Sequence, residues 1–147
     1  MQRPSRSYTG IFGVPRDRRP PTKGKLLIID DDRAFAVLAA AILRDAGYLV
    51  LEAYDAAQGY MFAQHDPPDL ILLDMLMPAG GGMNVLDRFQ ANSRLASLPV
   101  IVVTASTEPE LDEQVKAKGA LQVLRKPLDR DRLLWLVAQV ISERPAS

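Results

Sequence analysis

Cysteine is absent from the sequence, and His65 is the only histidine. The lack of thiols excludes disulfide bonds, thiolate metal sites and cysteine nucleophiles, and it fits a reducing compartment. A single imidazole excludes a zinc site built from several histidines, and we expect His65 to lie on the surface. No stretch reaches the roughly 18 consecutive apolar residues of a membrane span, and no signal-peptide core follows the basic N-terminus. These absences predict a cytoplasmic protein without a membrane span.

The composition is that of an ordinary globular protein, with 48% hydrophobic and 24% charged residues. Its 147 residues suffice for one domain with a full core and are too few for two. The formal net charge is zero, but residues 1–24 carry a net charge of +5 and the remaining residues −5. A basic segment therefore precedes an acidic body.

The basic segment at 1–24 contains four prolines and shows no sustained hydrophobic periodicity. It cannot bury enough apolar surface to fold alone, which predicts a disordered N-terminal tail or a start codon placed too early. Its one apolar cluster is formed by Tyr8, Ile11, Phe12 and Val14. An alternative is an arm that binds an anionic partner or folds back on the acidic body.

After Gly24, short apolar runs alternate with segments of helical periodicity. The runs predict strands at 26–29, 49–53, 70–73, 100–103 and 121–124. The intervening segments predict helices at 33–45, 55–65, 83–92, 108–118 and 129–143. In the first helix the expected buried face comprises Phe35, Leu38, Ala39, Ile42 and Leu43, and in the last it comprises Leu133, Leu136, Val137, Val140 and Ile141. This alternation predicts an α/β fold with a five-stranded parallel sheet covered on both faces.

Polar residues follow four of the five expected strands. The first strand is followed by the acidic triplet 30–32, the third by Asp74, the fourth by Thr104 and the fifth by Lys126. Each residue has an ordinary explanation by itself: Asp32 could cap the first helix, and Lys126 could be a solvated charge. Because the carboxyl ends of parallel strands meet at one edge, their coincidence there favours a functional site.

This set of side chains suits phosphoryl chemistry on a carboxylate. Clustered carboxylates resist ionisation, and a hard divalent cation relieves the repulsion. Oxygen ligands without sulfur or imidazole suit Mg2+. A nearby ammonium and hydroxyl can neutralise charge on a transferring phosphoryl group, and a carboxylate can itself be the nucleophile, which yields an aspartyl phosphate.

Four motifs in this order resemble the receiver domains of two-component response regulators, of the chemotaxis-type single-domain kind. They are Leu-Ile-Ile-Asp-Asp-Asp at 27–32, Leu-Leu-Asp-Met-Leu-Met-Pro at 72–78, Val-Thr-Ala at 103–105 and Leu-Arg-Lys-Pro at 124–127. The resemblance covers about residues 25–143 and leaves 144–147 as a short tail. It implies a doubly wound, flavodoxin-like (βα)5 fold with strand order 2-1-3-4-5.

The resemblance also implies a role for each polar residue. Asp74 would accept a phosphoryl group from a histidine kinase or a phosphotransfer protein. Thr104 would hydrogen-bond the phosphate, Lys126 would pair with it, and the Lys126-Pro127 bond would be cis. The Mg2+ ligands would be Asp31, Asp74 and the Leu76 carbonyl, with Asp30 acting through a water molecule. The triplet leaves this register open by one residue, although the spacing of Phe35 and Leu38 fits a pair that starts at Asp30.

Three positions depart from the usual pattern of the family. Val123 stands where an aromatic switch residue is common, so the usual coupling of that residue to Thr104 would be absent or rebuilt. The glycines at 80–82 predict a looser loop beside Asp74. Leu76 lies two residues after the acceptor and cannot orient a water molecule, which predicts a comparatively long-lived phosphoaspartate.

The expected function is a phosphorylation-controlled switch of the face formed by the fourth helix, fifth strand and fifth helix. With no output domain expected after Glu143, the signal would pass to a protein target or onward as a phosphoryl group, and a phosphorylation-dependent homodimer is compatible with this scheme. We expect no DNA binding by the acidic body and no enzymatic turnover beyond phosphoryl acceptance and slow self-dephosphorylation. Trp135 is expected to pack in the core or at its edge, with a partial interface role as an alternative.

Two other functions stay open. One is a receiver-like binding module that is never phosphorylated. The other is a phosphatase of the haloacid dehalogenase type, whose Asp-x-Asp motif Asp30 and Asp32 would fit, although Ala34 replaces the residue expected next.

Overall fold

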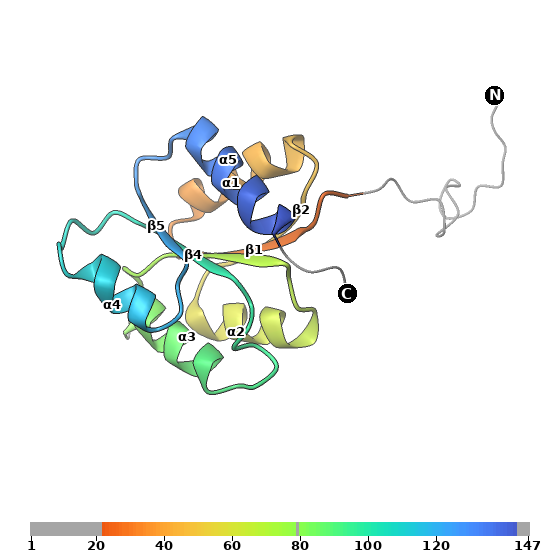
Figure 1. The fold of residues 1–147 in the computed structure, drawn as a ribbon. Coiled ribbons are helices and arrows are strands. Elements are labelled where there is room, and N and C mark those ends of the chain that lie inside the picture. Colours follow the sequence, from red (N-terminus) through yellow and green to blue (C-terminus); the bar gives the residue numbers. More distant parts are fainter. Residues whose placement is uncertain (1–21, 79, 144–147) are drawn as a thin grey trace, which may run out of the picture.

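One parallel sheet forms the centre of the molecule, with its strands in the order β2-β1-β3-β4-β5 (Figure 1). The computed structural model describes residues 22–78 and 80–143. Residues 1–21 of the predicted N-terminal tail and the predicted C-terminal tail at 144–147 lie outside the described residues. The strands are β1 (Lys25–Ile29), β2 (Leu49–Ala53), β3 (Leu70–Leu73), β4 (Val100–Thr104) and β5 (Gln122–Arg125). The predicted parallel sheet and its strand order are confirmed.

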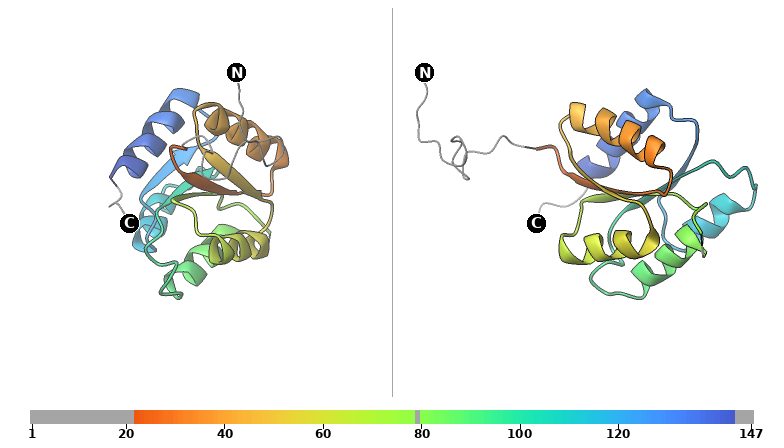
Figure 2. Two further views of the ribbon diagram at one scale, coloured as in Figure 1. Left: turned by 90° about the vertical axis from the view of Figure 1, so that its right-hand side faces the viewer. Right: turned by 180° about the vertical axis from the view of Figure 1, so that it is seen from behind.

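Helices cover both faces of the sheet, which explains why the central strands β1, β3 and β4 consist almost entirely of apolar residues. They are α1 (Arg33–Asp45), α2 (Ala56–His65), α3 (Gly81–Gln90), α4 (Leu111–Ala117) and α5 (Arg130–Ser142). Helices α1 and α5 lie on one face, and α2, α3 and α4 lie on the other (Figures 1 and 2). Alternate strand residues enter the two cores: Leu26 and Ile28 pack with α1 and α5, whereas Leu27 and Ile29 pack on the opposite side.

Aspartates define where three of the helices begin. The side chains of Asp32, Asp55 and Asp129 each accept a hydrogen bond from a backbone N–H of the first turn, at 3.1, 2.7 and 3.1 Å. This contact satisfies one of the donors that a helix start leaves unpaired. Asp32 thus has the capping role that the sequence left open, and it turns the chain directly from β1 into α1.

Two predictions about buried faces are wrong. Leu38 is 52% exposed, because α1 packs on the sheet through its small residues, and the buried positions are Ala36, Ala39, Ala40 and Leu43. Trp135 is 59% exposed, since α5 turns its apolar stripe of Leu133, Leu136 and Val137 inward and leaves the indole outside. The expected surface position of His65 is confirmed.

None of the helices in the described part of the chain combines the length and the apolar character needed to cross a bilayer.

Candidate functional site

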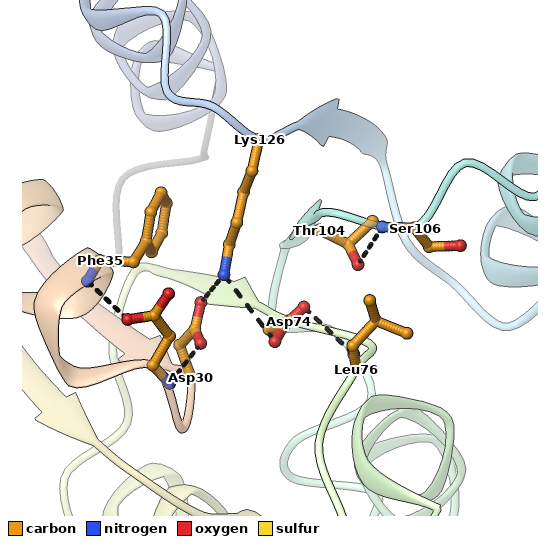
Figure 3. A network of polar contacts seen from close by, with 8 residues as sticks. Asp30, Phe35, Asp74, Leu76, Thr104, Ser106 and Lys126 are labelled. Atoms are coloured by element: carbon orange, nitrogen blue, oxygen red, sulfur yellow. Dashed lines mark hydrogen bonds and ion pairs between the residues drawn. The ribbon is translucent and has the colours of Figure 1, made fainter.

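Strands β1, β3, β4 and β5 bring Asp30, Asp74, Thr104 and Lys126 to one edge of the sheet, as expected (Figure 3). The register pairs Ile29 with Leu73, so the residues that follow them stand side by side. The N–H of Asp74 donates to the Ile29 carbonyl at 3.0 Å, which continues the ladder to the acceptor position. The polar side chains therefore converge because neighbouring strands end together.

Three carboxylates form an acidic pocket at this edge. Asp30, Asp31 and Asp74 each offer one oxygen, and these oxygens lie within 4.8 Å of one another. Asp30 is 1% exposed and Asp74 is 4% exposed, whereas Asp31 is open to solvent. Because Asp32 is used as the cap of α1, the register starts the acidic pair at Asp30. A donor set of oxygens alone, with two buried charges to offset, fits Mg2+.

Lys126 reaches into the acidic pocket from the end of β5. Its Nζ lies 2.7 Å from Asp30 Oδ2 and 3.9 Å from Asp74 Oδ2. The backbone N–H of Lys126 donates to the Thr104 carbonyl at 2.9 Å, and the Lys126-Pro127 peptide is cis, as expected. The ammonium therefore lies beside both buried carboxylates at once.

The electrostatics of the pocket are dominated by the burial of Asp30. Burial raises the pKa of the Asp30 carboxyl from 3.8 to about 6, and the charge of Asp74 adds to this rise. Hydrogen bonds from Lys126 and from the backbone N–H of Asp32 oppose it. One lysine therefore does not fully offset the buried negative charge, and the pocket favours additional positive charge.

Thr104 and Leu76 lie on the other side of Asp74 from Lys126 (Figure 3). Thr104 is fully buried, and its Oγ1 accepts the backbone N–H of Ser106 at 3.3 Å. Asp74 Oδ1 accepts the backbone N–H of Leu76 at 3.1 Å, which orients the carboxylate. The Leu76 side chain is apolar and largely exposed, so it offers no hydrogen-bonding group to the pocket.

The glycine loop beside Asp74 is packed rather than loose, which corrects the prediction for two of its three glycines. Gly81 and Gly82 are buried, and Gly80 alone is exposed. A Cβ at Gly82 would lie 2.7 Å from Met75 Cα and still closer to the carbonyl oxygen of Asp74. The absence of a side chain at Gly82 thus lets α3 press directly against the backbone that carries Asp74.

Sequence reasoning assigned no part in the pocket to Phe35, whose ring centroid lies 4.2 Å from Lys126 Nζ. The available signal was an aromatic residue in the first turn of the helix that follows the acidic pair. Its proximity to Lys126 depends on how α1 packs on the sheet and on the Lys126 side chain reaching from the end of β5 to Asp30 at the end of β1, which the sequence pattern alone does not reveal.

Comparison with known proteins identifies the family. Residues 26–138 match the sequence family described as the response regulator receiver domain. The chain belongs to this family. Receiver domains take phosphoryl groups from histidine kinases or phosphotransfer proteins and generally bind Mg2+. The alternative of a haloacid dehalogenase-type phosphatase is not retained, since Asp32 of its motif caps a helix and the fold is that of a receiver domain.

Several receiver proteins show the extent of the similarity. Sporulation initiation phosphotransferase F of Bacillus subtilis is 31% identical over 109 residues, which cover 74% of this chain and 86% of that protein. Protein PilH of Pseudomonas aeruginosa is 29% identical, with 80% and 98% covered. The DNA-binding dual master transcriptional regulator RpaA of Synechocystis is 37% identical, but the aligned part spans only 48% of its length. The crystal structure of chemotaxis protein CheY4 of Vibrio cholerae superposes with a TM-score of 0.74 at 31% identity, covering 79% of this chain and 97% of that one.

Proposed function

We propose that this receiver domain accepts a phosphoryl group on Asp74 and that phosphorylation switches a protein-binding face. The donor would be a histidine kinase or a phosphotransfer protein in the cytoplasm. The observation that carries the proposal is the placement of a buried carboxylate, Asp74, beside Asp30, Asp31 and the Lys126 ammonium. Such a carboxylate is a nucleophile surrounded by groups that can offset the charge of an incoming phosphoryl group.

The acidic pocket would hold Mg2+ through Asp31, Asp74 and the Leu76 carbonyl, with Asp30 acting through a water molecule. When bound, the ion would neutralise charge on the carboxylates and on the phosphoryl oxygens. In the transfer, the N–P bond of a phosphohistidine breaks and an O–P bond to Asp74 forms. Lys126 would pair with a phosphoryl oxygen, and the Thr104 hydroxyl would donate to another.

The switch would begin at Thr104. Its Oγ1 now accepts a hydrogen bond from the N–H of Ser106. If the Thr104 hydroxyl instead donated to a phosphoryl oxygen, Thr104 would move inward together with the loop that leads from β4 to α4. Arg125 at the end of β5 contacts both this loop and the start of α4, since its Nη2 lies 3.4 Å from the Glu108 carbonyl and 2.8 Å from Asp112 Oδ1. Because Val123 stands in place of an aromatic switch residue, these contacts of Arg125 offer another connection between the β4–α4 loop and the α4-β5-α5 face. The α4-β5-α5 face would then bind a protein target or a second phosphorylated copy.

In this role the domain would accept the phosphoryl group and lose it slowly to water, without turnover of a separate substrate. The domain would not bind DNA directly, because residues 25–147 carry a net charge of −5 and would be repelled by the phosphate backbone.

Incubation with Mg2+ and acetyl phosphate tests the proposal by intact-mass spectrometry. We expect one adduct of about 80 Da on the wild type and none on Asp74→Asn. Asp87→Asn, a variant of an exposed aspartate on α3, should be labelled like the wild type. An unlabelled wild type, with the donor shown to label another receiver domain, would instead favour a binding module that works without phosphorylation.

The phosphoaspartate should be long-lived, because the apolar Leu76 side chain beside Asp74 cannot orient a water molecule for attack. We expect Leu76→Asn to shorten the half-life about tenfold, since an amide can position water. Leu121→Asn, a change of a similarly exposed leucine at a distance from the pocket, should have no effect. The measurement is the decay of the adduct after removal of the donor. A wild-type half-life of seconds would refute this prediction.

A further inference from the structure

Lys126 Nζ has three close neighbours in the pocket, and one of them carries no charge. Two are the carboxylates of Asp30 and Asp74, at 2.7 and 3.9 Å. The third is the ring of Phe35, whose centroid lies 4.2 Å from the ammonium (Figure 3). This distance is well inside the limit of about 6 Å for attraction between a cation and an aromatic face.

The ring is held in this place by the start of α1. Phe35 lies in the first turn, where its backbone N–H donates to the Asp32 cap at 3.1 Å. Its side chain is half-buried against the core between α1, α5 and the sheet. The Lys126 side chain is only 13% exposed, so water weakens the contact little. The fixed aromatic ring of Phe35 therefore faces the ammonium of a Lys126 side chain that is mostly shielded from solvent.

We infer that Phe35 is a positioning residue for Lys126, and this inference rests on the proposed phosphorylation of Asp74. In Figure 3 the ring lies on the α1 side of the ammonium and Asp74 lies on the other side, so without the ring the ammonium would be held by the two carboxylates alone. The charge of the Asp74 carboxylate is lost when it becomes an acyl phosphate, and a cation in the acidic pocket would weaken both ion pairs. The ring neither titrates nor coordinates, so its attraction for the ammonium persists through these changes.

A purely space-filling role is the competing explanation, because leucine would also cover the core at this position. Fluorination separates the two roles, since it withdraws electron density from the ring face and changes its volume little. The matched control is Phe89 on α3, which is buried against Tyr60 with ring centroids 5.9 Å apart and lies on the opposite face of the sheet.

The experiment places phenylalanine with one, two or three fluorine atoms at position 35 and measures the rate of adduct formation from acetyl phosphate. We expect a graded loss, reaching about three- to tenfold with three fluorines, and a similar loss in Phe35→Leu. Phe35→Trp should retain the rate, because it keeps the aromatic face. The same fluorine series at Phe89 should leave the rate unchanged. Equal rates across the Phe35 series on a labelled wild type would overturn the inference and leave the proposed function intact.

A second measurement does not depend on phosphorylation. Urea unfolding without metal should show that fluorination of Phe35 lowers stability when Lys126 is present and has no effect in Lys126→Met. Equal effects in both backgrounds would show that the ring does not bind the ammonium. Failure to label the wild type would overturn the proposed function and the role of Phe35 within it. The unfolding comparison with and without Lys126 would still decide whether the Phe35 ring binds the ammonium.

Discussion

Asp30→Asn should make the metal-free domain more stable at neutral pH, by about 2–3 kcal/mol. Burial raises the pKa of Asp30 from 3.8 to about 6, so above pH 6 the folded chain must keep a charge in an unfavourable environment. Asparagine fills the same space without that charge. Lys126 would not be left unpaired, because Asp74 Oδ2 remains 3.9 Å from its ammonium.

The gain should depend on pH in a defined direction. Below about pH 3 the carboxyl is protonated in both the folded and the unfolded chain, and the two proteins should have the same free energy of unfolding. As pH rises from about 4 to 6, the unfolded chain releases the proton first, so the wild type loses stability relative to the variant. Above pH 6 the difference should be constant.

Urea unfolding from pH 4 to 8 in the presence of a chelator measures this difference. Asp45→Asn, at an exposed position on α1, should differ from the wild type by less than about 0.5 kcal/mol throughout. Added Mg2+ should stabilise the wild type more than Asp30→Asn at pH 7, and this advantage should fade below pH 6 as protons compete for Asp30. A variant less stable than the wild type at pH 7 without metal would contradict the prediction.

Gly82→Ala should destabilise the domain by about 3 kcal/mol, although helix propensity alone predicts a gain of roughly 1 kcal/mol. Gly82 lies in the first turn of α3, and a Cβ there would meet the backbone of Asp74 and Met75. Backbone cannot move aside as a flexible side chain can, so α3 must shift away from the acceptor strand. The shift should displace the Asp74 carboxylate and slow its phosphorylation together with the loss of stability.

Gly80→Ala provides the comparison within the same loop. Gly80 has a φ of 80°, but the nearest atom to an added Cβ is Asn84 Cβ at 4.0 Å. Its cost should be limited to the left-handed backbone, about 1–2 kcal/mol, with a normal rate of labelling. Chemical unfolding and intact-mass kinetics measure both effects. If Gly82→Ala were as stable as the wild type, the close contact between α3 and the Asp74 backbone would not constrain the loop.

The sequence predicted the site well because the site follows strand order. Asp30, Asp74 and Thr104 come directly after apolar runs, Lys126 follows the fifth strand, and parallel strands end at one edge. The family resemblance added which groups should act on a phosphoryl group. The prediction was poorer where a pattern permits more than one packing, as for Leu38 and Trp135, since helical periodicity indicates that a buried face exists but locates its centre only approximately.

By itself the sequence determined the (βα)5 alternation and the set of polar residues at the carboxyl edge, because each depends on neighbours in the chain. Only the tertiary structure decided that Asp32 is diverted from the acidic pocket, that Gly82 presses on the Asp74 backbone, and that Phe35 faces Lys126. These contacts depend on the angle and distance at which α1 and α3 pack on the sheet, and on where the end of β5 places Lys126. That geometry follows from how all the buried side chains pack together, and no local stretch of sequence contains it.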